Sequence, residues 1–153
     1  MQTRVAGFSK PGSPREFAKK LLRLAVAGGA AFWVTDLLMA VSPIAAVYQA
    51  AFSFASLPVA LAEALAGGLV IALGVSFFLL RFFERLPGKN PLLKALALSF
   101  GAMVFIEVLS AIGDPSHAAT YLLLDTGMNT PRFLTLGLTI GYLFDKPNRK
   151  VQP

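Results

Sequence analysis

Long blocks of apolar residues, rather than narrow amphipathic stripes, dominate the chain. Three of them reach about 20 residues or more, the length that an α-helix needs to cross the hydrocarbon core of a bilayer. They predict membrane-spanning helices over residues 21–42, 57–83 and 92–112. A water-soluble domain of this length could not bury so much apolar surface. We therefore expect an all-α integral membrane protein.

Breaks in the pattern indicate where the first helix begins and ends. Ser13 and Pro14 predict a helix start, with the serine as N-cap and the proline at N1, and Pro43 ends or kinks the helix. A cleaved signal peptide is the alternative, but the long preceding segment and Asp36 within the block argue against it. Residues 44–56 are too short to cross and contain aromatic residues, which favours a short helix at the outer interface.

The last apolar region is irregular. Residues 117–144 divide into two moderately apolar pieces, with a predicted break near residues 126–131, where Thr130 would cap and Pro131 would begin a second helix. The second piece has only about 14 residues, or roughly 21 Å, which is short for a crossing. Either the membrane is thinned locally, or the fourth span is a broken helix that lines a cavity or is buried in protein. The predicted fold is a single antiparallel four-helix bundle over residues 14–146.

The charges indicate how the bundle is oriented. The chain has 153 residues, of which 56% are hydrophobic and 14% charged, with a net charge of +6. All Lys and Arg residues except Arg132 lie in three segments that flank the apolar blocks, whereas a nucleic-acid-binding surface would need no apolar span between its parts. These segments are residues 4–23, 81–94 and 146–150. The pattern predicts a bacterial or archaeal plasma membrane, with a flexible basic tail (1–13) and a C-terminal tail (147–153) in the cytoplasm.

The residue types exclude several kinds of active site. There is no cysteine and only one histidine, His117, so one chain cannot form a thiolate nucleophile or a multi-histidine metal site. No nucleotide-binding, hydrolase or zinc-protease motif is present. We expect no cofactor, leave the question of a metal open, and rank an enzyme acting on lipid third among the functions.

Charged residues within the apolar spans are the candidate site. Counted from the inner boundary of each span at 1.5 Å per residue, four of them from four spans lie about 20–27 Å deep, in the outer third of the membrane. They are Asp36, Glu63, Glu107 and Arg132. Three further polar residues lie near this level, Asp114, His117 and Asp125. Ionisable residues inside a membrane are functional-site candidates, so the set predicts a pocket for a proton, a cation or a polar headgroup.

Glu107 is the most informative of these residues. It shares one helix face with Ser99 and Met103, and this face is expected to point inward because a carboxylate facing lipid is costly. The alternative is structural, in which one buried pair of Arg132 with Glu107 or Asp36 only fixes helix registry and the other acids lie at the interface.

Two functional hypotheses follow, besides the enzyme. The first is a small transporter or ion-handling protein, acting as a homo-oligomer because four short spans rarely enclose a path alone. The second is an accessory subunit of a larger membrane complex, whose charges pair with a partner chain. Gly137 and Gly141 form a G-x-x-x-G pattern suited to close helix packing, either within the bundle or between copies.

Overall fold

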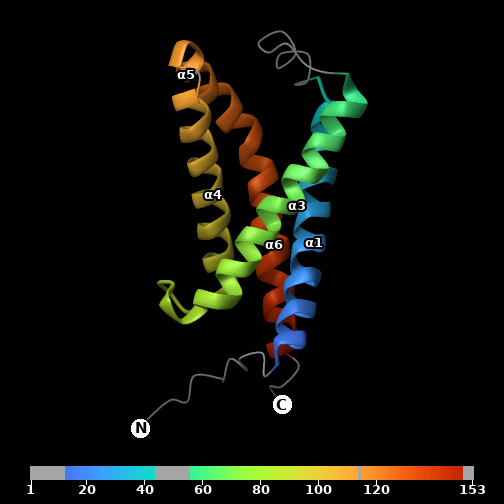
Figure 1. Cartoon of the computed structure of the whole chain (residues 1–153), viewed down its shortest axis with the longest axis vertical. Helices are drawn as coiled ribbons and strands as arrows, with labels where there is room; N and C mark the ends of the chain where they lie inside the picture. Colours follow the sequence, from blue (N-terminus) through green and yellow to red (C-terminus); the bar gives the residue numbers. More distant parts are fainter. Residues whose placement is uncertain (1–12, 44–55, 114, 150–153) are drawn as a thin grey trace.

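A computed structural model describes residues 13–43, 56–113 and 115–149. These residues form helices and turns, and no strand is found among them. Successive long helices run in alternating directions (Figure 1). The four long helices are α1 (Pro14–Ala40), α3 (Leu57–Phe82), α4 (Pro91–Gly113) and α6 (Thr126–Arg149). Residues 44–55 of the predicted interfacial helix lie outside the described residues.

Short elements connect the long helices. A 3₁₀ turn, η1 (Phe83–Arg85), follows α3. Three short elements lie between α4 and α6: a 3₁₀ turn η2 (Pro115–His117), a helical turn α5 (Ala118–Thr120) and a π-helical turn η3 (Tyr121–Asp125). The π-helical turn leads directly into α6, so the chain changes from i→i+5 to i→i+4 hydrogen bonding at Thr126.

The first three long helices match the predicted spans closely. The Ser13 hydroxyl oxygen accepts a hydrogen bond of 3.2 Å from the Glu16 backbone N–H, which confirms the predicted cap. Three helices (α1, α3 and α4) are long and apolar enough to cross a membrane. Many of their exposed side chains are apolar, as with Val70 and Phe105, which are 70% and 65% exposed. These features support a helical membrane protein.

The predicted helix break near residues 126–131 is wrong in its position. Helix α6 begins at Thr126 and continues through Pro131 without interruption, and the change of helix type lies just before it. The Thr130 hydroxyl does not cap a helix start, because it donates to the Thr126 carbonyl oxygen one turn earlier at 2.8 Å. Pro131 is the sixth residue of α6 and has no N–H to donate to the Gly127 carbonyl four residues earlier, so one intrahelical hydrogen bond is absent at this point of the continuous helix.

Helix α6 lies at the centre of the core. Four of its side chains, at helical spacing, are at most 1% exposed: Phe133, Leu136, Ile140 and Phe144. The most extensive contacts join α1 with α3 and α4 with α6, and α1 also packs along α6. The molecule therefore consists of two helix pairs that are joined mainly through α1 and α6.

Glycines allow close approach within each helix pair. A Cβ atom built on Gly29 of α1 would lie 3.1 Å from the Leu69 Cα of α3, and one on Gly141 of α6 would lie 2.8 Å from the Leu92 Cα of α4. The G-x-x-x-G pattern of α6 thus serves packing inside the chain. Of the two uses that the sequence left open, the structure shows this one.

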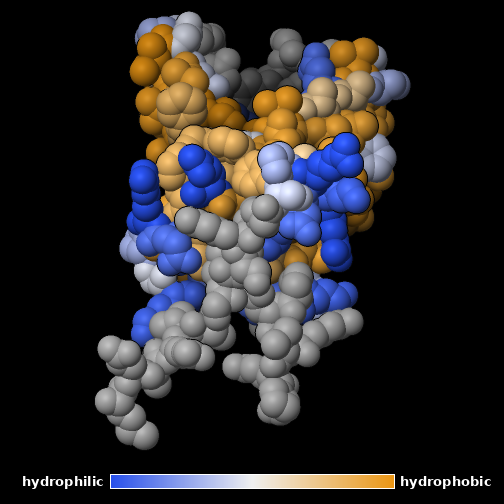
Figure 2. Space-filling view, turned by 60° about the horizontal axis from the view of Figure 1, so that its bottom comes forward, coloured by the Kyte–Doolittle hydropathy of each residue, from blue (hydrophilic) through white to orange (hydrophobic). Residues whose placement is uncertain are grey.

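Hydrophilic side chains gather at one end of the bundle (Figure 2), where Lys20, Arg85 and Lys94 lie, and this end is here called the basic end. There Phe83 and Phe144 stack with ring centroids 5.1 Å apart. The Lys94 ammonium lies 3.8 Å from the Phe83 ring centroid and donates to the Phe83 carbonyl at 2.7 Å, while the Lys20 ammonium lies 4.6 Å from the Phe144 ring centroid. These cation–π contacts connect α1, η1, α4 and α6 at this end. The opposite end, where α1 ends and α3 begins, is called the distal end.

Candidate functional site

An ion pair joins α1 and α6 towards the distal end. The Asp36 carboxylate of α1 pairs with the Arg132 guanidinium of α6, and both side chains are largely buried. Nearby, the hydroxyl oxygens of Thr35 and Thr135 lie 2.8 Å apart and link the same two helices. Towards the distal end, α1 and α6 are therefore joined by polar groups within an otherwise apolar bundle.

Asn129 extends this pair to a third helix. Its amide nitrogen donates to the Glu107 Oε1 atom of α4 at 2.7 Å, and its amide oxygen accepts from the Arg132 Nη1 atom at 2.8 Å. Asn129 and Arg132 are three residues apart in α6 and so lie on the same helix face. The result is one continuous network, Asp36–Arg132–Asn129–Glu107, which we call the polar network.

Glu107 is the most buried acid of the network, with 2% of its surface exposed. Ser99 and Met103, on the same face of α4, are buried as well, so this face points inward as the spacing predicts. The Ser99 hydroxyl donates to the Phe133 carbonyl of α6 at 2.6 Å. This hydrogen bond joins α4 to α6 about two helical turns before Glu107.

Two buried atoms of the network have no hydrogen-bond partner among the described residues. They are Glu107 Oε2 and Arg132 Nε. The Asp125 carboxyl, at the end of the π-helical turn, lies close enough to Glu107 for their charges to interact. When all groups are ionised, three carboxylates face one guanidinium, so the site has an excess of negative charge that a proton or a cation would neutralise.

The structure brings some of the predicted site residues together and leaves others apart. It brings together Asp36, Glu107 and Arg132, with Asp125 alongside. Glu63 is exposed on α3 and takes no part in the polar network. Asp114 lies outside the described residues, and so does the side chain of His117, whose backbone ends η2.

Sequence reasoning missed Asn129 as a member of the site. Asn129 falls in the segment that was predicted to be a break between helices, where an asparagine has an ordinary role as a turn residue. The signal that could have found it is its spacing of three residues from Arg132, which is typical of neighbours on one helix face.

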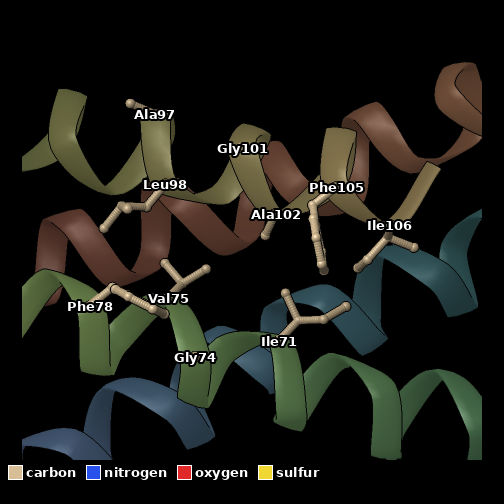
Figure 3. A pocket seen from close by; sticks show the side chains of 10 residues that line it. All are labelled: Ile71, Gly74, Val75, Phe78, Ala97, Leu98, Gly101, Ala102, Phe105 and Ile106. Carbon is tan, nitrogen blue, oxygen red and sulfur yellow. The ribbon is translucent and has the colours of Figure 1, made fainter. Parts of the chain in front are cut away.

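An apolar groove lies between α3 and α4 (Figure 3). Its volume is about 380 Å³, and every residue that lines it is apolar or glycine. In Figure 3, Ile71 and Val75 point from α3 towards α4, while Phe105 and Ile106 point back from α4. Glu107 is not among the lining residues, because its carboxyl is directed to Asn129 of α6 on another face of α4.

The arrangement is suited to holding positive charge inside an apolar bundle. Within the described parts of the chain, no group of three or more His, Cys, Asp or Glu residues is placed to hold a metal ion. No protein-family model matches the sequence, and no similar curated protein or solved structure was found.

Proposed function

We propose that this chain is a small polytopic membrane protein that transports or exchanges a proton or a cation, which it binds at Glu107. One observation carries the proposal: Glu107 is 2% exposed, with Oε1 held by Asn129 and Oε2 without a hydrogen-bond partner among the described residues. A buried carboxylate oxygen without a partner is costly, and binding a proton or a cation removes that cost.

The proposal includes four spans with both termini in the cytoplasm of a bacterial or archaeal plasma membrane. With 24 residues, α6 is about 36 Å long, enough to cross beside the three apolar helices. Its buried residues and its place between α1 and α4 support its role as the fourth span. The three basic segments fit the positive-inside rule. Because four helices rarely enclose a path alone, we propose that copies assemble into a homo-oligomer.

Within the network, the roles differ. Asp36 and Arg132 neutralise each other, whereas the Glu107 carboxyl accepts a hydrogen bond from the neutral Asn129 amide and lies near the acidic Asp125. The Asp36–Arg132 pair fixes α1 against α6, and Glu107 is the member that takes up and releases positive charge. Asn129 is a positioning residue, because its amide nitrogen donates to the Glu107 carboxyl while Arg132 donates to its amide oxygen and orients it.

The test is uptake of protons or monovalent cations by liposomes containing the purified protein. Glu107→Gln keeps the shape of the side chain and an oxygen for the Asn129 amide, so the variant is expected to fold and to lose uptake. Glu63→Gln is the matched control, since it removes the same charge from an exposed position on α3, and it should transport normally. Unchanged uptake in both Glu107→Gln and Arg132→Gln would refute the proposal.

The exposed Glu63 favours a second candidate, an accessory subunit of a larger membrane complex. A carboxylate exposed on an apolar helix is costly in lipid and would be stabilised by a cationic residue of a partner chain. This function predicts a stoichiometric foreign chain in the native mass of the particle purified in mild detergent. It also predicts that Glu63→Gln, rather than Glu107→Gln, releases that chain. A particle containing only this protein would exclude it.

A further inference from the structure

We propose that the positive charge taken up at Glu107 is a proton, that the carboxyls of Glu107 and Asp125 share it, and that the orientation of Asn129 selects it over metal ions. The inference rests on the proposed function, which names a proton or a cation without deciding between them. It also gives Asp125 a part in binding.

The two carboxyls meet from different elements of the fold. Glu107 projects from α4, whereas Asp125 ends the π-helical turn η3 directly before α6. The Asp125 carboxyl lies within hydrogen-bonding reach of the Glu107 carboxyl. Two ionised carboxylates have only acceptor atoms and repel each other, so the contact becomes a hydrogen bond only when a proton lies between them. Paired carboxyls in such a position hold one proton in common.

Arg132 fixes the orientation of the Asn129 amide. A guanidinium has only donors, so the atom of Asn129 that faces Arg132 is the amide oxygen, which accepts from Nη1 at 2.8 Å. The amide nitrogen is thereby directed to Glu107 and donates to Oε1 at 2.7 Å. With the amide reversed, two donors would face each other at Arg132. Asn129 therefore presents a donor, and not an oxygen ligand, to Glu107.

This donor suits a protonated carboxyl better than a carboxylate that binds a metal ion. In the neutral carboxyl, Oε1 is the carbonyl oxygen that accepts from Asn129, and Oε2, which has no hydrogen-bond partner among the described residues, can carry the hydrogen. A metal ion needs several oxygen ligands to replace its water. In the parts of the chain that the structure describes, no third acidic residue or histidine joins Glu107 and Asp125 in a group that could hold one.

The burial of the pair also favours a proton. Glu107 is 2% exposed, whereas Asp125 is half-buried at the distal end. A proton can pass from water to Asp125 and then to Glu107, with one O–H bond breaking as the next forms, whereas a hydrated ion would need an opening in the bundle. The other charged group that acts on Glu107 is Arg132 of α6, which is paired with Asp36 of α1, while Glu63 of α3 is exposed.

Infrared difference spectroscopy of the full-length protein in lipid nanodiscs tests the inference. The unmodified protein near neutral pH should show the carbonyl band of a neutral carboxyl that is lost in Glu107→Gln. Glu63→Gln, which removes the same group from an exposed position, is the matched control and should keep the band. Asp125→Asn should shift the band, because a neutral amide replaces the charged acceptor of the shared proton.

The exclusion of metal ions is tested on the unmodified protein, so that this test does not depend on the folding of a variant. At constant pH and ionic strength, choline chloride is replaced by sodium, potassium or calcium chloride. The carbonyl band of Glu107 should be unchanged in each salt. A band that weakens as one of these ions is added would show that the ion displaces the proton, and would overturn the inference.

The outcomes separate this inference from the proposed function. A band that is the same in Asp125→Asn and in the unmodified protein overturns the shared proton. Absence of a band that depends on Glu107, together with sodium or potassium uptake that depends on Glu107, overturns the inference and leaves the proposed function standing. Absence of both the band and any uptake that depends on Glu107 overturns the two together.

Discussion

Replacing Arg132 by methionine is expected to destabilise the protein strongly. Its guanidinium pairs with Asp36 and donates to Asn129, and the Arg132 and Asp36 side chains are only 16% and 11% exposed. Removing one partner of a buried ion pair costs about 3–5 kcal/mol, because the other charge is left uncompensated. The lost hydrogen bond to Asn129 adds about 0.6 kcal/mol, the average for such bonds between membrane helices. The expected decrease in the free energy of unfolding is therefore about 4–5 kcal/mol.

Removing both charges should cost much less. In the double variant Asp36→Leu with Arg132→Met, no charge is left buried and two apolar side chains fill the space, so a loss of about 1 kcal/mol is expected. The coupling between the two sites would then amount to several kcal/mol in favour of the pair. This comparison separates the ion pair from the general effect of altering α1 or α6.

Reversible unfolding in mixed detergent micelles, with increasing fractions of a denaturing detergent, measures these differences. Trp33 is the only tryptophan, and its indole N–H donates to the Leu61 carbonyl of α3 at 3.0 Å, so its fluorescence reports on the α1–α3 contact. The unmodified protein, the two single variants and the double variant form a double-mutant cycle. If the effects of the single changes add up to that of the double change within about 0.5 kcal/mol, the reasoning is refuted.

Two further changes probe the packing. Gly141→Ala should lower the free energy of unfolding by about 1–3 kcal/mol, because its Cβ would lie 2.8 Å from the Leu92 Cα; Gly67→Ala, where the space is open, should be neutral or stabilise by up to about 1 kcal/mol through helix propensity. Equal effects in the same unfolding assay would contradict the glycine argument. Ser99→Ala removes the hydrogen bond to the Phe133 carbonyl and should cost about 0.6 kcal/mol, at most about 1.7 kcal/mol; a loss above 3 kcal/mol would show that Ser99 has another role.

The sequence was sufficient to place residues along the helix axes. Apolar block length predicted α1, α3 and α4 to within a few residues, apart from the first turns of α1, and Ser13 predicted the start of that helix. The same counting placed Asp36, Glu107 and Arg132 at one level, and the structure brings them into one network. Position along an axis follows from a fixed rise per residue and needs no knowledge of neighbouring helices.

The rotation of each helix about its axis could not be predicted in the same way. Glu63 was predicted at the depth of the other charges, but α3 turns Gly68 towards Phe32 of α1. Five residues correspond to about 140° of rotation, so Glu63 is directed away from the interior. Asn129 was missed for a related reason, because its bonds to Glu107 and Arg132 exist only once α4 and α6 have met. These contacts override the local turn preference of the segment.

The division into two helix pairs has a consequence for biosynthesis. Neighbouring helices α1 and α3 can pack as soon as both have left the ribosome, and the same holds for α4 and α6. The contact between α1 and α6 joins residues far apart in the sequence, 100 positions in the case of Thr35 and Thr135. The Asp36 carboxylate therefore cannot form its ion pair in the nascent chain until Arg132 has been synthesised. Closure of the polar network is thus a late step of membrane integration, and a chain truncated before α6 would present an uncompensated acid to the quality-control machinery of the cell.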